Sequence, residues 1–125
     1  MPTQEAVMTA QDVANRLKEL FDQNKWMEAQ QELFSEDAES IEPKNSPGLQ
    51  SVKGLDAIKK KGDDFNNMVE EMHGGYVTDF VVAGNHIACG MGMDVTMKGM
   101  GRVKMDEIAV YEVKDGKIVK EQFFY

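Results

Sequence analysis

The sequence predicts an α+β protein in which helices cover one face of a curved, mainly antiparallel sheet. In the first half of the chain, apolar residues recur at helical spacing. From Tyr76 onward they alternate with a period of two, as in strands with one buried face. Short glycine-containing turns separate the alternating segments, and tight turns can join only antiparallel neighbours.

The first helix is expected to begin after Thr9, with Asp12 at the capping-box position. A short second helix follows and includes Phe34. Segment 36–54 contains two prolines and two glycines, which predict a short extended stretch and then an irregular loop. A third helix is expected from about Leu55 to a glycine cap at 74–75. The apolar positions that define the three helices are Val13, Leu17, Leu20, Phe21; Trp26, Ala29, Leu33, Phe34; and Leu55, Ile58, Phe65, Met68, Val69, Met72.

Four strands are expected in the second half of the chain, over residues 76–84, 85–97, 101–113 and 117–125. The turns between them are predicted at Gly84-Asn85, Lys98-Gly99 and Asp115-Gly116, which contain the residues that adopt positive φ most readily. These strands complete one domain, covering residues 1–125, because a chain of 125 residues is large enough for one core.

Composition and charge exclude several classes of protein. The single cysteine, Cys89, rules out an intramolecular disulfide and a cysteine zinc cluster. The formal net charge of −8 argues against nucleic-acid binding, and the run Lys59–Lys61 is interpreted as a solvent-exposed helix face. The sequence contains no signal-peptide pattern and no apolar run of membrane-helix length. We therefore expect a cytoplasmic protein with neither a membrane nor a nucleic-acid partner.

The methionine-rich segment 85–97 alternates as a strand, and its apolar face should meet the helices. Cys89, Met91 and Met93 lie on that face, and thioether and thiolate sulfurs are ligands that Cu(I) favours. His86 points the other way and there is no second cysteine, so we expect no metal and no cofactor. Methionine as an adaptable lining for an irregular apolar cavity is the better interpretation.

Two acids fall among apolar positions of the last two strands. Glu107 shares a face with Met105 and Tyr111, and Glu121 shares one with Val119, Phe123 and Tyr125. A buried carboxylate either finds partners or holds its proton, which would make each acid a candidate general acid or base. Both could instead be surface acids, or be paired with Arg102, Lys104 or Lys120.

The segments "LKELFDQNKWMEAQQELFSEDAESIEP", "VKGLDAIKK" and "VYEVKDGKIVKEQFF" resemble the nuclear transport factor 2-like superfamily, in its SnoaL-like and ketosteroid-isomerase-like branch. The resemblance covers roughly residues 8–125. It implies a cone-shaped barrel, in which a highly curved, mainly antiparallel sheet wraps around about three N-terminal helices. It also implies an apolar pocket at one end, and a homodimer packed through the sheets.

The resemblance also suggests catalytic positions. Steroid isomerases of this branch use a carboxylate just before a proline as the base, and Glu42 precedes Pro43 here. Their oxyanion-binding tyrosine and aspartate correspond to Leu17 and to a position near Ala109, neither of which can donate a hydrogen bond. Steroid isomerisation is therefore disfavoured. SnoaL-like cyclases use an acid/base aspartate, which Glu42, Glu107 and Glu121 would replace by position.

Two functions remain open at this stage. One is acid/base isomerisation, cyclisation or hydrolysis of a small apolar metabolite, and the other is a binding module or carrier without turnover. A closed dimeric scaffold is a third possibility. Dehydratase relatives use a His–Asp pair, for which His73 and His86 are poorly placed. The candidate catalytic residues are Glu42, Glu107 and Glu121, and the candidate ligand-binding residues are Leu17, Cys89, Met91, Met93, Met105, Tyr111, Phe123 and Tyr125.

Overall fold

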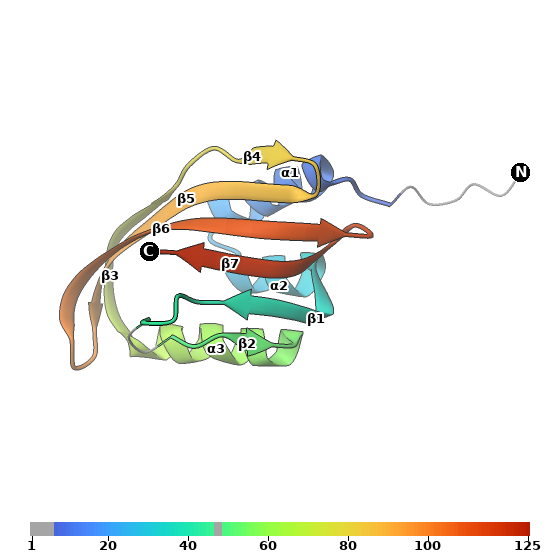
Figure 1. The fold of residues 1–125 in the computed structure, drawn as a ribbon. Coiled ribbons are helices and arrows are strands. Elements are labelled where there is room, and N and C mark those ends of the chain that lie inside the picture. The colour runs from blue at the N-terminus through green and yellow to red at the C-terminus, as the bar shows by residue number, and fades with distance from the viewer. Residues whose placement is uncertain (1–6, 47–48) are drawn as a thin grey trace, which may run out of the picture.

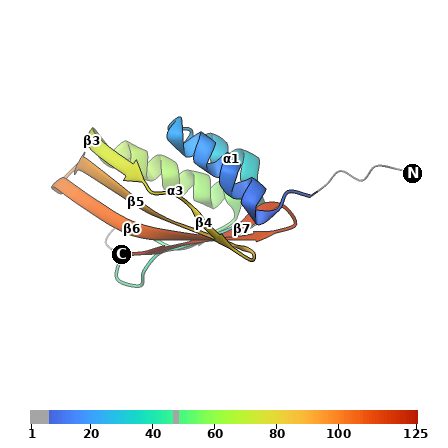
Figure 2. The same cartoon turned by 90° about the horizontal axis from the view of Figure 1, so that it is seen from above.

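The computed structural model describes residues 7–46 and 49–125 of the chain. In these ranges three helices pack against one face of a curved seven-stranded sheet, which does not close into a complete barrel (Figures 1 and 2). The predicted α+β class is confirmed. The elements are α1 Ala10–Asp22, α2 Trp26–Leu33, β1 Phe34–Ile41, β2 Val52–Lys53, α3 Leu55–Met68, β3 Val69–Val77, β4 Val81–Ala83, β5 His86–Met97, β6 Gly101–Lys114 and β7 Lys117–Phe124.

The start of α1 agrees with the prediction. Asp12 donates its backbone N–H to Thr9 Oγ1 at 3.1 Å, and the Thr9 N–H donates to Asp12 Oδ2 at 3.0 Å. This capping box satisfies two backbone donors that the helix itself leaves free. The expected apolar stripe of α1 is buried. None of the helices in the described part of the chain is both long and apolar enough to span a membrane.

The predicted end of the third helix is wrong. Helix α3 ends at Met68, and residues 69–77 form β3, an edge strand paired with β5. Two register shifts interrupt this pairing, near Glu71 and between Met72 and Gly74, so β3 lacks the alternation that marks a strand in sequence. The glycines at 74–75 lie inside this strand instead of capping a helix. Residues 78–80 then separate β3 from β4, so 76–84 is not one strand.

Phe34, which the sequence places in the second helix, is the first residue of β1. This strand pairs in parallel with β7, whereas the other strand pairings are antiparallel. The strand order is β2-β1-β7-β6-β5-β3, with β4 beside β5. The parallel pairing sets Ser40 directly beside Glu121, although 81 positions separate them in sequence. The fold therefore brings polar residues of the first half of the chain onto the inner face of the last strand.

The alternation of β5 and β6 is as predicted. Cys89, Met91 and Val95 are buried on the inner face, and Met91 lies opposite Glu107 in the ladder. The alternation of β7 differs, because the pairing with β6 skips Val119: Glu112 faces Lys120 and Val113 faces Ile118. This β-bulge buries Ile118 completely in place of Val119.

The glycines on the outer face of β5 accommodate side chains of the same chain. A β-carbon at Gly92 would lie 2.7 Å from Cζ of Tyr76, and one at Gly90 would lie 3.0 Å from Cγ2 of Thr78. The Tyr76 ring lies over Gly92, and its hydroxyl donates to Asp106 Oδ1 at 2.6 Å. The small residues of this face thus allow a tyrosine to lie flat across three neighbouring strands.

Candidate functional site

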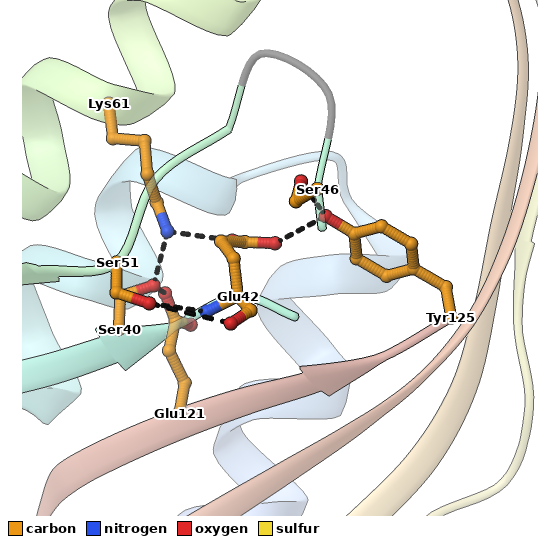
Figure 3. Close-up of polar contacts among 7 residues, drawn as sticks. All are labelled: Ser40, Glu42, Ser46, Ser51, Lys61, Glu121 and Tyr125. Carbon is orange, nitrogen blue, oxygen red and sulfur yellow. Dashed lines mark hydrogen bonds and ion pairs between the residues drawn. The ribbon is translucent and has the colours of Figure 1, made fainter. Parts of the chain in front are cut away.

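An ion pair between Glu42 and Lys61 forms the centre of a polar cluster at the end of β1 (Figure 3). Lys61 Nζ lies 2.7 Å from Glu42 Oε2, and the two side chains are 15% and 4% exposed. The expectation that Lys59–Lys61 is a solvent-exposed run is therefore wrong for Lys61. Its position in the sequence contains a signal for this, because Lys61 follows Ile58 by three residues and precedes Phe65 by four, on the inward side of α3.

Lys61 also links the cluster to Glu121 through Ser40. Lys61 Nζ donates to Ser40 Oγ at 2.6 Å, and Ser40 Oγ donates to Glu121 Oε1 at 2.7 Å. Ser40 and Glu121 are both buried. Burial raises the pKa of Glu121 to about 7, although the Ser40 hydrogen bond and the Lys61 charge oppose the rise. Glu121 is thus an interior acid that titrates near neutrality.

Ser46, Ser51 and Tyr125 complete the hydrogen bonds around Glu42. Tyr125 Oη donates to Glu42 Oε1 at 2.8 Å and is itself hydrogen-bonded to Ser46 Oγ, while the Glu42 N–H donates to Ser51 Oγ at 2.9 Å. Loss of solvent and the neighbouring Glu42 raise the pKa of Tyr125 to about 12, so its hydroxyl remains a donor at neutral pH. Both carboxylate oxygens of Glu42 therefore have a partner.

Glu107 differs from the other two acids. It is half-buried on the inner face of β6, and no side chain in the described ranges hydrogen-bonds to its carboxylate. Burial raises the pKa of Glu107 to about 7, and the charges of Glu42 and Glu121 add to the rise. At neutral pH this carboxyl is therefore close to half-protonated, with its oxygens available to another molecule.

The predicted ligand-binding residues lie at different depths. Leu17, Cys89, Met91 and Tyr111 are buried in the core. Burial raises the pKa of the Cys89 thiol to about 11 and that of Tyr111 well above 10, so both keep their protons. Inner-face residues that remain partly accessible are Met93, Met105 and Phe123, and Tyr125 is exposed at the edge.

A surface hollow of about 360 Å³ opens beside Glu42 and Tyr125, at the end of β7. Lys61 Nζ, 5.7 Å from the ring centroid of Phe123, lies near this end of the sheet. The hollow includes no methionine, so it is not the methionine-lined space that the sequence suggested. Its lining residues are Ile41, Glu42, Pro43, Lys44, Gln122, Phe123, Phe124 and Tyr125.

The two histidines lie outside the cluster. His73 is on the edge strand β3, where its Nε2 is 2.7 Å from Thr96 Oγ1, and His86 is exposed at the start of β5. No group of three or more His, Cys, Asp or Glu side chains is arranged to hold a metal ion within residues 7–46 and 49–125. The chemically distinctive residues of the inner face are thus three glutamates and one lysine.

Residues 8–125 match the family model of the SnoaL-like domain. One similar solved structure is from Mesorhizobium loti and is named as a proposed SnoaL-like polyketide cyclase and also as a carbohydrate phosphatase. Its sequence is 34% identical to this chain, and the two structures superpose with a TM-score of 0.87. The match covers 94% of this chain and 100% of that chain.

Two further solved structures share the fold at lower identity. An NTF2-like protein from Burkholderia thailandensis is 16% identical, with a TM-score of 0.79, over 94% of this chain and 90% of that chain. TerC, co-crystallized with polyporic acid, is 17% identical, with a TM-score of 0.71, over 93% and 90% of the two chains. A search of curated proteins finds no match. The match to the family model and the similarity to the Mesorhizobium structure together show that the chain belongs to the SnoaL-like domain family, with the nuclear transport factor 2-like fold.

Proposed function

We propose that this protein is an acid/base enzyme, an isomerase, cyclase or hydrolase of a small and mainly apolar metabolite, with Glu107 as the proton-transferring group. One observation carries the proposal. Glu107 is a partly accessible inner-face carboxyl without a hydrogen-bonding side chain, and its pKa is raised to about 7. General acid/base catalysis is most efficient when the catalytic pKa lies near the working pH.

The proposed role of each residue follows from its contacts. Glu107 as a carboxylate removes a proton from the substrate, and as the neutral acid it returns the proton to another atom. Tyr125 donates its hydroxyl proton to Glu42 and so helps to hold that glutamate in place. By the resemblance, the oxyanion-binding positions of steroid isomerases correspond to Leu17 and to a position near Ala109, and neither side chain has a polar atom. Steroid isomerisation therefore stays disfavoured, since this donor pair supplies several kcal/mol of transition-state stabilisation.

The side chains around Glu107 favour a substrate that is neutral or cationic. Met91, in register with Glu107, and Met93 and Met105 beside it present adaptable apolar surface on the inner face. Lys61 is already bonded to Glu42 and Ser40, so its charge is compensated. An anionic substrate would meet three glutamates without a free counter-charge. The similar protein named as a proposed polyketide cyclase supports a small organic ligand.

The proposal is tested first by locating where a small apolar probe binds. In protein labelled with ¹³C at the methionine methyls, benzyl alcohol is expected to shift the signals of Met91, Met93 and Met105. The exposed Met72 and Met100 serve as internal controls and should not move. Shifts confined to the exposed methionines would contradict a ligand site on the inner face. Benzylamine and benzoate, tested in parallel, report whether a negative charge is rejected.

Turnover is tested with Glu107→Gln, once a screen of neutral and cationic metabolites finds a converted compound. Loss of the acid/base group is expected to lower kcat by about 10²–10⁴-fold, while binding is retained. Glu112→Gln is the matched control, because this glutamate lies on the opposite face of the same strand. The carrier alternative is favoured by the methionine-rich face. It predicts tight binding that Glu107→Gln does not change and no conversion of the bound compound.

We also propose that the chain forms a homodimer through the outer face of its sheet. Apolar side chains on this face are unusually exposed: Val81 is 67% exposed, and the ladder partners Ile108 and Phe124 are 49% and 50% exposed. A second copy would cover this apolar surface. Light scattering at micromolar concentration is expected to give twice the chain mass, and Ile108→Glu is expected to reduce it to the monomer. A monomer mass for the unmodified protein would contradict the proposal.

A further inference from the structure

We propose that Lys61 is a positioning residue: it holds Glu42 directly and Glu121 through Ser40, and thereby leaves Glu107, on strand β6, as the inner-face glutamate that is free to exchange a proton with a ligand. This inference rests on the proposed function, since it divides the work among the acids of that site. It adds a role for a side chain that belongs to neither the catalytic nor the ligand-binding set expected from the sequence.

The hydrogen-bond directions in the cluster follow from the chemistry of the lysine. An ammonium group has three protons and no acceptor. Ser40 Oγ, 2.6 Å from Lys61 Nζ, must therefore accept from the lysine. The single hydroxyl proton of Ser40 is then directed to Glu121 Oε1 at 2.7 Å. Lys61 thus orients the Ser40 hydroxyl toward Glu121, and Figure 3 shows the three residues linked in this order.

Glu42 is held on both sides of its carboxylate. Lys61 approaches Oε2 at 2.7 Å, and the Tyr125 hydroxyl approaches Oε1 at 2.8 Å. A carboxylate with both oxygens engaged and only 4% of its side chain exposed has little freedom to rotate toward a ligand. Glu107 has neither constraint. The inner face therefore contains two glutamates held directly by Lys61 or through Ser40, and one glutamate without such bonds.

Lys61 also balances the charge that surrounds Glu107. The titratable groups that interact electrostatically with Glu107 come from every element packed around it. They are Glu42 after β1, Lys61 on α3, Cys89 on β5, Tyr111 on β6, Glu121 on β7 and Tyr125 after β7. Lys61 is the cation of this set, and it lowers the pKa of both Glu107 and Glu121. Without it, three carboxyl groups would share a poorly solvated region, and like charges there favour proton retention.

The test compares Lys61→Met with Lys60→Met by following the carboxyl ¹³C signals of the glutamates against pH. Lys60 is a matched control, because it lies one position away and pairs with Asp64 at 2.8 Å on the exposed side of α3. Lys61→Met is expected to raise the titration midpoint of Glu107 by about one pH unit, of the order that a nearby charge produces. Lys60→Met should leave it unchanged. An unchanged Glu107 midpoint in folded Lys61→Met would overturn the inference.

Ser40→Ala provides a second variant in case Lys61→Met does not fold. It retains the Lys61–Glu42 pair but removes the link to Glu121, so the Glu121 midpoint should rise while that of Glu107 stays within a few tenths of a unit. An unmoved Glu121 midpoint would contradict the proposed link. Both titrations need no substrate. A protein that shows these shifts but neither binds nor converts small molecules would therefore refute the proposed function and leave the role of Lys61 standing.

Discussion

Replacing Glu121 by glutamine is expected to remove part of the pH dependence of folding stability. The pKa of Glu121 is about 7 in the folded protein, above the reference value of 4.5 that applies to an unfolded chain. Between these values the folded state binds more protons than the unfolded state, so the free energy of unfolding falls as pH rises. The stabilisation by this proton is present below about pH 4.5 and is lost above about pH 7.

The size of the effect follows from the same two values. A shift from 4.5 to about 7 is worth about 3 kcal/mol at 1.36 kcal/mol per unit, and about 2 kcal/mol of this is lost between pH 5 and pH 8. Glutamine resembles the neutral acid in shape and keeps an oxygen for the Ser40 hydroxyl. Glu121→Gln should therefore match the unmodified protein at pH 5 and exceed its stability by about 2 kcal/mol at pH 8.

The assay is urea unfolding at several pH values between 5 and 8, followed by far-UV circular dichroism. Glu112→Gln serves as the control, because this glutamate is on the outer side of the sheet, where its side chain is 41% exposed. Its stability difference from the unmodified protein should be the same at every pH. Parallel curves for Glu121→Gln and the unmodified protein across the whole range would refute the argument that Glu121 retains its proton on folding.

Three further predictions concern the fold. In denaturant unfolding, Ile118→Ala should lower the free energy of unfolding by about 2–5 kcal/mol and Val119→Ala by less than about 1 kcal/mol, because the bulge buries the isoleucine. The reverse order would place the bulge elsewhere. Thr9→Ala should lower the free energy of unfolding by about 1 kcal/mol through loss of the N-cap, and no change would contradict the capping box. Cys89, with its pKa near 11 and its side chain buried, should react with an aromatic disulfide at pH 8 far more slowly in the native protein than in urea; equal rates would show an accessible thiol.

Features determined by nearby residues were predictable from the sequence. The capping box of α1 needs only Thr9 and Asp12, and the turn at 115–116 has positive φ at both residues, as an Asp-Gly hairpin turn requires. The inward face of β5 followed from strict alternation over its whole length. The alternation of β6 put Glu107 on the same face as Tyr111, but whether that face is the inner one depends on the register with β5, which the structure shows.

Features determined by distant contacts were not predictable in the same way. The end of α3 was missed because the register shifts of β3 leave apolar residues at spacing that also suits a helix. The bulge at Val119 depends on how two complete strands pair. Lys61 has the composition of a surface residue, and its partners Glu42 and Ser40 reach it only through the parallel pairing of β1 with β7. Its place on the inward stripe of the helix was the available sequence signal.

The pH titration of the Glu107 carboxyl ¹³C signal in the unmodified protein tests the central claim most directly. Burial and the neighbouring acids predict a midpoint near 7 for this glutamate, with about half of the molecules protonated under neutral conditions. A midpoint near 4.5, the value for a fully solvated glutamate, would mean that the inner face is well hydrated around Glu107. In that case the carboxyl would have no special capacity for proton transfer at neutral pH, and the proposed acid/base function would lose its main support.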